Sequence, residues 1–120
     1  IAKTLVYRLC AYRNSIAPVI PERILTRAPS AELRPDQTDQ DNLPEYDVID
    51  GIIEHYVEQN QSAAQIVAAG FERAAVEQIV RLIRINEYKR KQSPPGPRIT
   101  GRAYGRDWRY PLSNGFRETF

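Results

Sequence analysis

The sequence predicts an all-α fold with long loops. Three long segments repeat apolar residues at the 3.6-residue period of a helix, no segment alternates apolar and polar residues as a strand does, and nine prolines separate the periodic segments. The 120 residues fit one domain at most. The apolar fraction of 42% and the charged fraction of 27% are ordinary for a globular protein, and no run approaches the roughly 18 apolar residues of a membrane span.

A first helix is expected over residues 3–14, where one face carries an apolar stripe. Asn14 is a residue type that tolerates the left-handed turn at a helix end. Residues 16–20 should be extended, because a proline inside this stretch holds the residue before it away from the helical region. One helical turn should follow over residues 21–25, with Pro21 at its first position. The stripe consists of Leu5, Val6, Leu9 and Cys10.

Three more helices are expected further along the chain. Residues 47–59 carry the clearest apolar stripe of the sequence. A short helix should begin after Ser62, since Ser62 and Gln65 have the spacing of a capping box, and Gly70 should end it. The helix predicted over residues 72–91 is apolar around more than half of its circumference and should therefore be the most buried one.

Two segments are expected to be irregular. Three prolines and a long polar run make residues 26–46 a loop, and loops of this length inside a compact domain are usually functional or disordered. Residues 93–120 form a basic tail after a Ser-Pro-Pro-Gly-Pro break. Residues 89–120 hold eight bases against two acids, whereas residues 28–60 hold nine acids against one base. We expect the tail to meet an anion, such as a phosphate, a carboxylate, a nucleic acid or the acidic half of its own chain.

Several common classes of site are excluded by the residues themselves. The sequence has no Gly-rich phosphate loop, no zinc-ligand spacing and no serine nucleophile motif. Cys10 is the only cysteine, which excludes an internal disulfide and favours a reducing, cytosolic setting. We expect Cys10 to be a buried small hydrophobe and His55 to be structural or solvated. The carboxylates Asp36, Asp39 and Asp41 fit a solvated loop better than a metal site, because their spacing does not match an EF-hand.

Two basic features leave alternatives open. The tail interleaves arginines with aromatic residues, a composition that binds single-stranded nucleic acid, although such segments also fold onto acidic helices. Lys89 and Arg90 end a predicted helix just before the Pro-Pro-Gly turn. A rigid helix could hold them for recognition of an anionic ligand, or they could simply complement the negative helix end.

Eight short blocks occur in a fixed order along the chain. They are Lys3–Leu9, Ile20–Arg27, Pro29–Pro35, Gln37–Asp39, Tyr46–Asp50, Glu87–Gln92, Pro94–Gly96 and Gly105–Pro111. In this order they resemble the C-terminal part of the ammonia-transferring domain of the glutamine-dependent NAD synthetases. The blocks span nearly the whole chain, so that together they are far more specific than any single motif.

The resemblance implies a fold and a reaction. The complete domain would be an α/β fold of the adenine nucleotide alpha hydrolase type, of which this chain is the helical end. The enzyme would use ATP and magnesium to adenylate the nicotinate carboxylate of deamido-NAD, with release of pyrophosphate. Ammonia released from glutamine in a nitrilase-like domain would then attack the activated carbonyl to give NAD.

The resemblance also implies roles for individual residues. Lys3 and Ser30 match positions near ATP and pyrophosphate, and Lys89 matches the lysine that contacts deamido-NAD, with Arg90 beside it. Residues 26–46 match a mobile loop that covers the substrates. No residue matches a metal ligand, and Asp107 falls in a family block without an assigned role.

The expected whole is therefore larger than this sequence. The chain lacks a methionine and the Ser-Gly-Gly-x-Asp-Ser pyrophosphate loop of the family, so we interpret residues 1–120 as the C-terminal portion of the synthetase domain. Alone it should be inactive and bind no cofactor; the whole enzyme should be cytoplasmic and homo-oligomeric, without membrane or nucleic-acid partners. The alternative is a stand-alone helical module that binds nucleic acid or dimerises through the tail.

Overall fold

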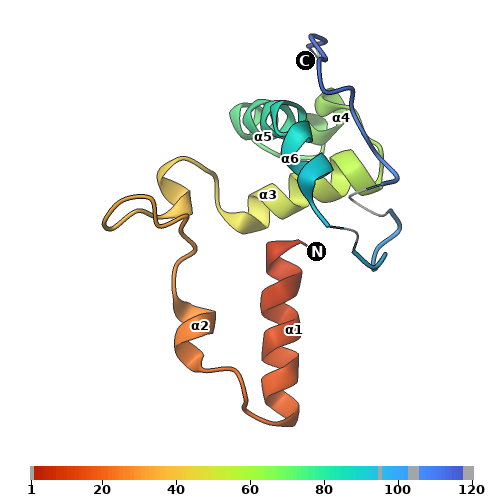
Figure 1. Cartoon of the computed structure of the whole chain (residues 1–120). Helices are drawn as coiled ribbons and strands as arrows, with labels where there is room; N and C mark the ends of the chain where they lie inside the picture. The colour runs from red at the N-terminus through yellow and green to blue at the C-terminus, as the bar shows by residue number, and fades with distance from the viewer. Residues whose placement is uncertain (1, 95, 103–105, 118–120) are drawn as a thin grey trace. The chain divides into compact units, whose positions relative to one another are not determined.

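The computed structural model describes residues 2–94, 96–102 and 106–117. These ranges contain helices, turns and loops but no strand, which confirms the all-helical prediction (Figure 1). Within them, no helix combines the length and the apolar character that crossing a membrane requires. The chain divides into two compact units, residues 1–50 and residues 51–120. The helical segments are α1 Lys3–Ile16, α2 Glu22–Thr26, the 3-10 turn η1 Asp39–Asp41, α3 Tyr46–Ile53, the π-helical turn η2 Glu54–Glu58, α4 Ala63–Ala68, α5 Arg73–Ile85 and α6 Glu87–Gln92.

Helix α1 is longer than its sequence predicts. Its first turn is capped by Asp50, whose carboxylate accepts a 2.7 Å hydrogen bond from the Thr4 backbone N–H. The helix continues past Asn14, where the sequence predicts its end, to Ile16. The Asn14 side chain does not end the helix; it forms hydrogen bonds to the backbone of the segment that follows. Its Oδ1 accepts from the backbone N–H groups of Val19 and Ile20, at 3.1 and 2.9 Å, and its Nδ2 donates to the Ile20 carbonyl at 2.9 Å.

The helical turn predicted over residues 21–25 is α2. Pro21 occupies the N-cap, one position earlier than predicted, where its missing N–H is equally harmless. The loop that follows contains η1, and the Asp41 carboxylate caps this turn by accepting from the Thr38 backbone N–H at 3.1 Å. That hydrogen bond is the main reason why the pKa of Asp41 lies below its usual value.

The core of residues 51–120 is formed by α5 with the segments that pack against it. Helix α5 contacts α4 and α6, and α4 also contacts η2. The predicted capping box is confirmed: Ser62 Oγ accepts from the Gln65 backbone N–H at 3.3 Å, and Gln65 Oε1 accepts from the Ser62 backbone N–H at 2.8 Å. Gly70, at a φ of 106°, follows the end of α4 as predicted. The buried apolar residues of this unit are Ile52, Tyr56, Val57, Ala63, Ile66, Ala75, Val76, Ile79, Val80 and Ile83.

Two helices predicted to be continuous are interrupted. In residues 47–59 the last turn widens into η2, where the Gln59 N–H bonds to the Glu54 carbonyl at 3.0 Å. The wider turn lets the adjacent residues Tyr56 and Val57 both face the core. The predicted 72–91 helix breaks at Asn86, between α5 and α6. The Asn86 side chain competes for the helix's own acceptors by donating to the Leu82 carbonyl at 2.9 Å.

The described part of the tail packs on its own unit. The Trp108 ring meets Tyr56 edge-on at 5.2 Å and Tyr110 at 4.7 Å, and the hydroxyls of Tyr56 and Tyr110 lie 2.6 Å apart. Glu58 accepts from the Thr100 hydroxyl at 2.7 Å and from the Arg102 backbone N–H at 2.9 Å. The tail therefore finds its anion within its own chain, which was one of the four partners that its charge allowed.

Candidate functional site

A cavity in residues 1–50 brings together two of the predicted site residues. Lys3, from the first turn of α1, and Ser30, from the loop after α2, both line this space of about 440 Å³. Arg27 also lines this space, together with Asp39 and with the Glu32 carboxylate that pairs with Arg27. A lysine and a hydroxyl are groups with which proteins bind phosphates, since the cation attracts the charge and the hydroxyl donates to an oxygen.

Lys3 is held beside aromatic rings. Its Nζ lies 5.5 Å from the centre of the Tyr7 ring and 5.9 Å from the centre of the Tyr46 ring. The face of an aromatic ring attracts a cation without neutralising its charge. The ammonium group is thus restrained and still carries its full charge for an anionic ligand.

Ser30 begins a turn in the loop. Its Oγ accepts a 3.0 Å hydrogen bond from the backbone N–H of Glu32, which is the local turn that serines commonly form. An accepting hydroxyl keeps its own proton, so Ser30 can still donate to a ligand. The turn and a ligand-binding role are therefore compatible at this residue.

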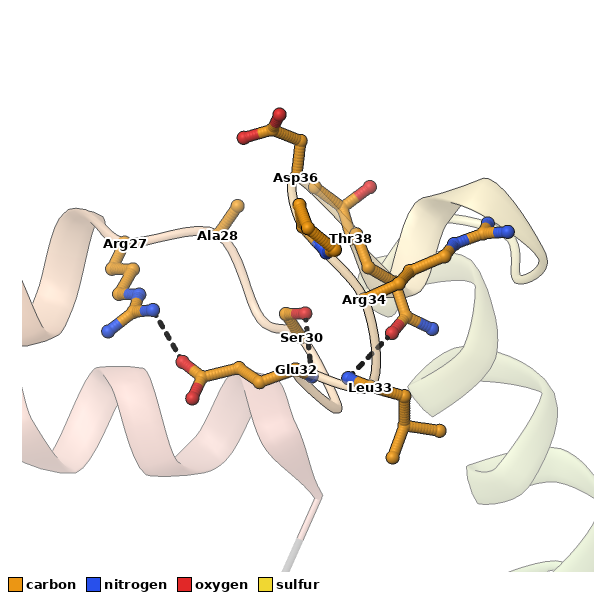
Figure 2. Close-up of a pocket in the computed structure, with 10 residues that line it drawn as sticks. Arg27, Ala28, Ser30, Glu32, Leu33, Arg34, Asp36 and Thr38 are labelled. Carbon is orange, nitrogen blue, oxygen red and sulfur yellow. Dashed lines mark hydrogen bonds and ion pairs between the residues drawn. The ribbon is translucent and has the colours of Figure 1, made fainter.

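The loop around Ser30 encloses a second space, of about 720 Å³, lined only by residues between Arg27 and Thr38 (Figure 2). The Arg27 guanidinium pairs with the Glu32 carboxylate across it, and the Leu33 backbone N–H donates to Gln37 Oε1 at 3.0 Å. Glu32 and Asp36 both have a φ of 54°, the left-handed region that is uncommon for residues other than glycine. These side-chain contacts hold the loop in its turns.

Tyr46 and Asp39 form a short side-chain hydrogen bond near Lys3. The Tyr46 hydroxyl donates to Asp39 Oδ2 at 2.6 Å. This hydrogen bond, with partial burial and the charge of Asp39 in addition, raises the pKa of Tyr46 to about 12. Tyr46 is therefore protonated, and able to donate, throughout the neutral range.

Lys89 and Arg90, the other two predicted residues, lie in residues 51–120 and have opposite environments. Lys89 is exposed on α6, with its Nζ 6.0 Å from the Tyr88 ring centre. Arg90 is buried, and its guanidinium donates to Glu87 Oε2 at 2.8 Å and to the Trp108 carbonyl at 2.5 Å. Arg109 reaches the same Glu87 carboxylate from the tail, at 2.7 Å. Lys89 can meet a ligand, whereas Arg90 fixes the helix that carries it.

The remaining candidates from the sequence have structural surroundings. His55 Nδ1 lies 2.9 Å from Gln61 Oε1, and its ring meets Phe71 edge-on. Cys10, expected to be buried, is only half-buried and lines the cavity beside Lys3. In the part of the chain that the structure describes, no three His, Cys, Asp or Glu side chains gather in a way that could hold a metal ion.

Sequence reasoning missed several residues that shape these sites. Arg27 ends one of the eight blocks, but nothing in its neighbours shows that it shares a cavity with Lys3. Tyr46 and Asp39 lie seven positions apart across a loop, a separation that implies no contact. Glu87 was read only as part of a basic helix end, although its spacing to Arg90 matches the i, i+3 pairing of helices.

A cavity that holds Lys3 and Ser30 beside a structured loop is the kind of site in which an anion-binding domain receives its ligand. Comparison with known proteins identifies the family of this chain. The NAD synthase family model matches residues 1–93, and the chain belongs to this family. A glutamine-dependent NAD(+) synthetase of Acinetobacter baylyi is 55% identical over 117 residues, which are 96% of this chain and 22% of that protein. The corresponding protein of Aquifex aeolicus is 56% identical over 114 residues, 95% of this chain and 20% of its own length.

A solved structure agrees with the sequence matches. The glutamine-dependent NAD+ synthetase of Acinetobacter baumannii, in complex with ADP, superposes with a TM-score of 0.62 at 43% identity, over 100% of this chain and 20% of that one. The chain thus spans about a fifth of the length of the curated relatives it matches.

Proposed function

We propose that this chain works within a glutamine-dependent NAD synthetase. In that reaction the nicotinate carboxylate of deamido-NAD attacks the α-phosphorus of ATP and pyrophosphate leaves. Ammonia derived from glutamine then attacks the activated carbonyl, AMP leaves, and the amide of NAD forms. The observation that carries the proposal is the shared cavity of Lys3 and Ser30, in a chain whose family makes NAD.

Lys3 and Ser30 are proposed to bind the phosphates of ATP and the leaving pyrophosphate. Negative charge grows on the pyrophosphate as the phosphorus–oxygen bond breaks, so a fixed cation stabilises the transition state more than the ground state. Lys3 suits this role because its aromatic neighbours restrain the ammonium group and leave its charge intact. The Ser30 hydroxyl would donate to a phosphate oxygen.

Lys89 and Arg90 are proposed to serve deamido-NAD at the tip of α6. Lys89 would contact the dinucleotide directly, because its side chain is exposed. Arg90 would act by holding α6 against Glu87 and the tail, since its guanidinium is buried in those contacts. The loop of residues 26–46 is proposed to cover the substrates.

Other parts of the whole enzyme remain proposals of the same kind. They include an α/β domain completed by residues outside this sequence, a homo-oligomeric assembly and a cytoplasmic location. Magnesium would neutralise phosphate charge in the complete site. The described residues form no ligand set for it, so we assign it to phosphate oxygens and to other parts of the enzyme.

The alternative of a nucleic-acid-binding tail has less support. Single-strand binding uses aromatic faces presented to bases. Trp108 and Tyr110 instead pack edge-on against each other, and Trp108 packs against the core residue Tyr56. Binding of an oligonucleotide that weakens steeply with added salt would revive this alternative.

The test uses Lys3→Ala and Lys89→Ala in the full-length enzyme, with steady-state kinetics for each substrate. Lys3→Ala should lower kcat/KM for ATP, and Lys89→Ala should raise the KM for deamido-NAD, each by about tenfold or more, since each removes a hydrogen bond to a charged group. Glutaminase activity measured alone should be unchanged. Equal loss of both activities would point to misfolding. An unchanged kcat/KM for ATP in Lys3→Ala, or an unchanged KM for deamido-NAD in Lys89→Ala, would refute the proposed role of that residue. Residues 1–120 alone should form no NAD.

A further inference from the structure

Tyr46 serves both halves of the proposed phosphate site, although its sequence gives no sign of a role. It is the first residue of α3 and is half-buried. Its ring lies 5.9 Å from the Lys3 ammonium group, and its hydroxyl donates to Asp39 at 2.6 Å. The Tyr46 ring thus restrains the Lys3 ammonium group, and the Tyr46 hydroxyl restrains the Asp39 carboxylate in the loop.

Asp39 carries this restraint on to Ser30. The Asp39 backbone N–H donates to the Pro29 carbonyl at 2.9 Å, directly before Ser30 in the chain. Asp39 is itself held, because its carbonyl accepts from the backbone N–H groups of Asn42 and Leu43 at 3.2 and 3.0 Å. A continuous set of contacts therefore runs from Lys3 through Tyr46 and Asp39 to the residue beside Ser30.

We propose that Tyr46 is a positioning residue that couples Lys3 on α1 to Ser30 in the loop, so that both groups meet one phosphate together. The inference rests on the proposed function, which places a phosphate between these two residues. Two groups on separate segments bind one ligand well only when their separation is held in advance.

The chemistry of Tyr46 suits this role better than an acidic residue would. A carboxylate at this position would pair with Lys3 and compete with the incoming phosphate. The phenol ring attracts the ammonium group more weakly than an ion pair does, and a phosphate can add to that contact without displacing it. The hydroxyl also engages Asp39, whose negative charge lines the same cavity and would otherwise be free to turn towards the ligand.

The test compares four single variants of the full-length enzyme with the double variant that combines Tyr46→Phe and Asp39→Ala. Tyr46→Phe keeps the ring beside Lys3 and removes only the donor to Asp39. Asp39→Ala removes the acceptor, whereas Asp39→Asn keeps an oxygen that can accept from Tyr46. Tyr12→Phe is the matched control, because Tyr12 is 67% exposed on the same unit and does not line the cavity.

Tyr46→Phe and Asp39→Ala are each expected to raise the KM for ATP about tenfold, the loss of one hydrogen bond to a charged group. The double variant should be no worse than the single ones, because both remove the same contact. Asp39→Asn should stay within about twofold of the wild type, as should Tyr12→Phe. Glutaminase activity should be unchanged in all of them.

Each other outcome has a definite meaning. An unchanged KM in Tyr46→Phe, or equal damage by Asp39→Asn and Asp39→Ala, overturns the coupling while Lys3→Ala still tests the proposed function. A rise in every KM together with a lower melting temperature shows a merely structural role and also overturns it. A rise confined to deamido-NAD supports the coupling and moves the phosphate at Lys3 from ATP to the dinucleotide. If Lys3→Ala changes neither kcat nor KM, the proposed function fails first.

Discussion

The carboxylate of Glu87 is buried between two arginines of different origin. Its side chain is 2% exposed, the Arg90 side chain 7% and the Arg109 side chain 29%. Buried charges are costly unless they are paired, so the carboxylate and both guanidiniums depend on one another. The sequence indicated the cations at the end of the helix but placed all of them at its surface. A helical period shows which face a residue occupies, and it does not show that a charged residue will fold inward to a partner.

Glu87→Gln should therefore destabilise the protein by about 3 kcal/mol, because it leaves buried guanidiniums without their counter-charge. Chemical denaturation of the full-length protein would measure this. Glu77→Gln is the matched control, since Glu77 also pairs with an arginine on a helix, Arg73, but with 46% of its side chain exposed. It should change stability by no more than about 0.5 kcal/mol. Similar effects of the two changes would show that burial of the Glu87 cluster contributes nothing.

The hydroxyl of Tyr46 gives a prediction about pH. Its pKa is raised from 10.0 to about 12, chiefly by the hydrogen bond to Asp39. The folded state thus favours the protonated hydroxyl, and the stability from this bond is complete below pH 10 and is lost as the pH rises through about 12. Tyrosinate absorbance, taken as the difference between wild type and Tyr46→Phe, should show this late titration. Titration at the ordinary value would contradict the hydrogen bond.

At the scale of elements, local chemistry was predictable and tertiary competition was not. The box between Ser62 and Gln65 could be predicted because both partners lie within one helical turn. The interruptions of the helices expected over residues 47–59 and 72–91 could not be predicted in this way. The core selects the wide turn that buries Tyr56 beside Val57, and Asn86 competes with the backbone where α5 meets α6. The helical spacing of apolar residues in the sequence continues through both interruptions and gives no sign of them.

The packing of α3 on the segment before α5 gives a prediction about Gly51. A Cβ atom there would lie 2.8 Å from the Phe71 ring, closer than carbon atoms tolerate. Gly51→Ala should destabilise by about 1–3 kcal/mol through overpacking, and adding Phe71→Leu should recover part of the loss. Thermal unfolding would measure both. Gly96→Ala, where a Cβ would meet nothing within 4 Å, is the control. A neutral Gly51→Ala would mean that Phe71 moves away easily.

At the scale of the whole molecule, the sequence separates an acidic segment, residues 28–60, from a basic one, residues 89–120, and hydrogen bonds of Glu58 join the two. The tail was expected to meet an anion, and Glu58 and Glu87 supply one within residues 51–120. The resemblance indicated Lys3 and Ser30 as site residues, but only the structure shows that they line one cavity. The contact between Tyr46 and Asp39 could not be predicted, because two residues seven positions apart across a loop have no periodic signature.

The single tryptophan, Trp108, can report whether the tail unfolds together with the helices. Trp108 packs on the core residue Tyr56, so its fluorescence should change at the same denaturant concentration as helical circular dichroism when residues 1–120 are unfolded. Agreement of the two transitions would show that the tail and helices unfold together. A fluorescence change at lower denaturant would show that the tail detaches first.

The wide turn η2 has a consequence for variation in length. A π-turn contains one residue more than an α-turn, so a gene shortened by one codon between Glu54 and Glu58 could still encode a regular helix. Because the wide turn accommodates that extra residue, its loss would leave the side chains after it close to their present directions around the axis. Glu58 would still reach Thr100 and Arg102, so such a deletion should preserve both the helix content and the attachment of the tail.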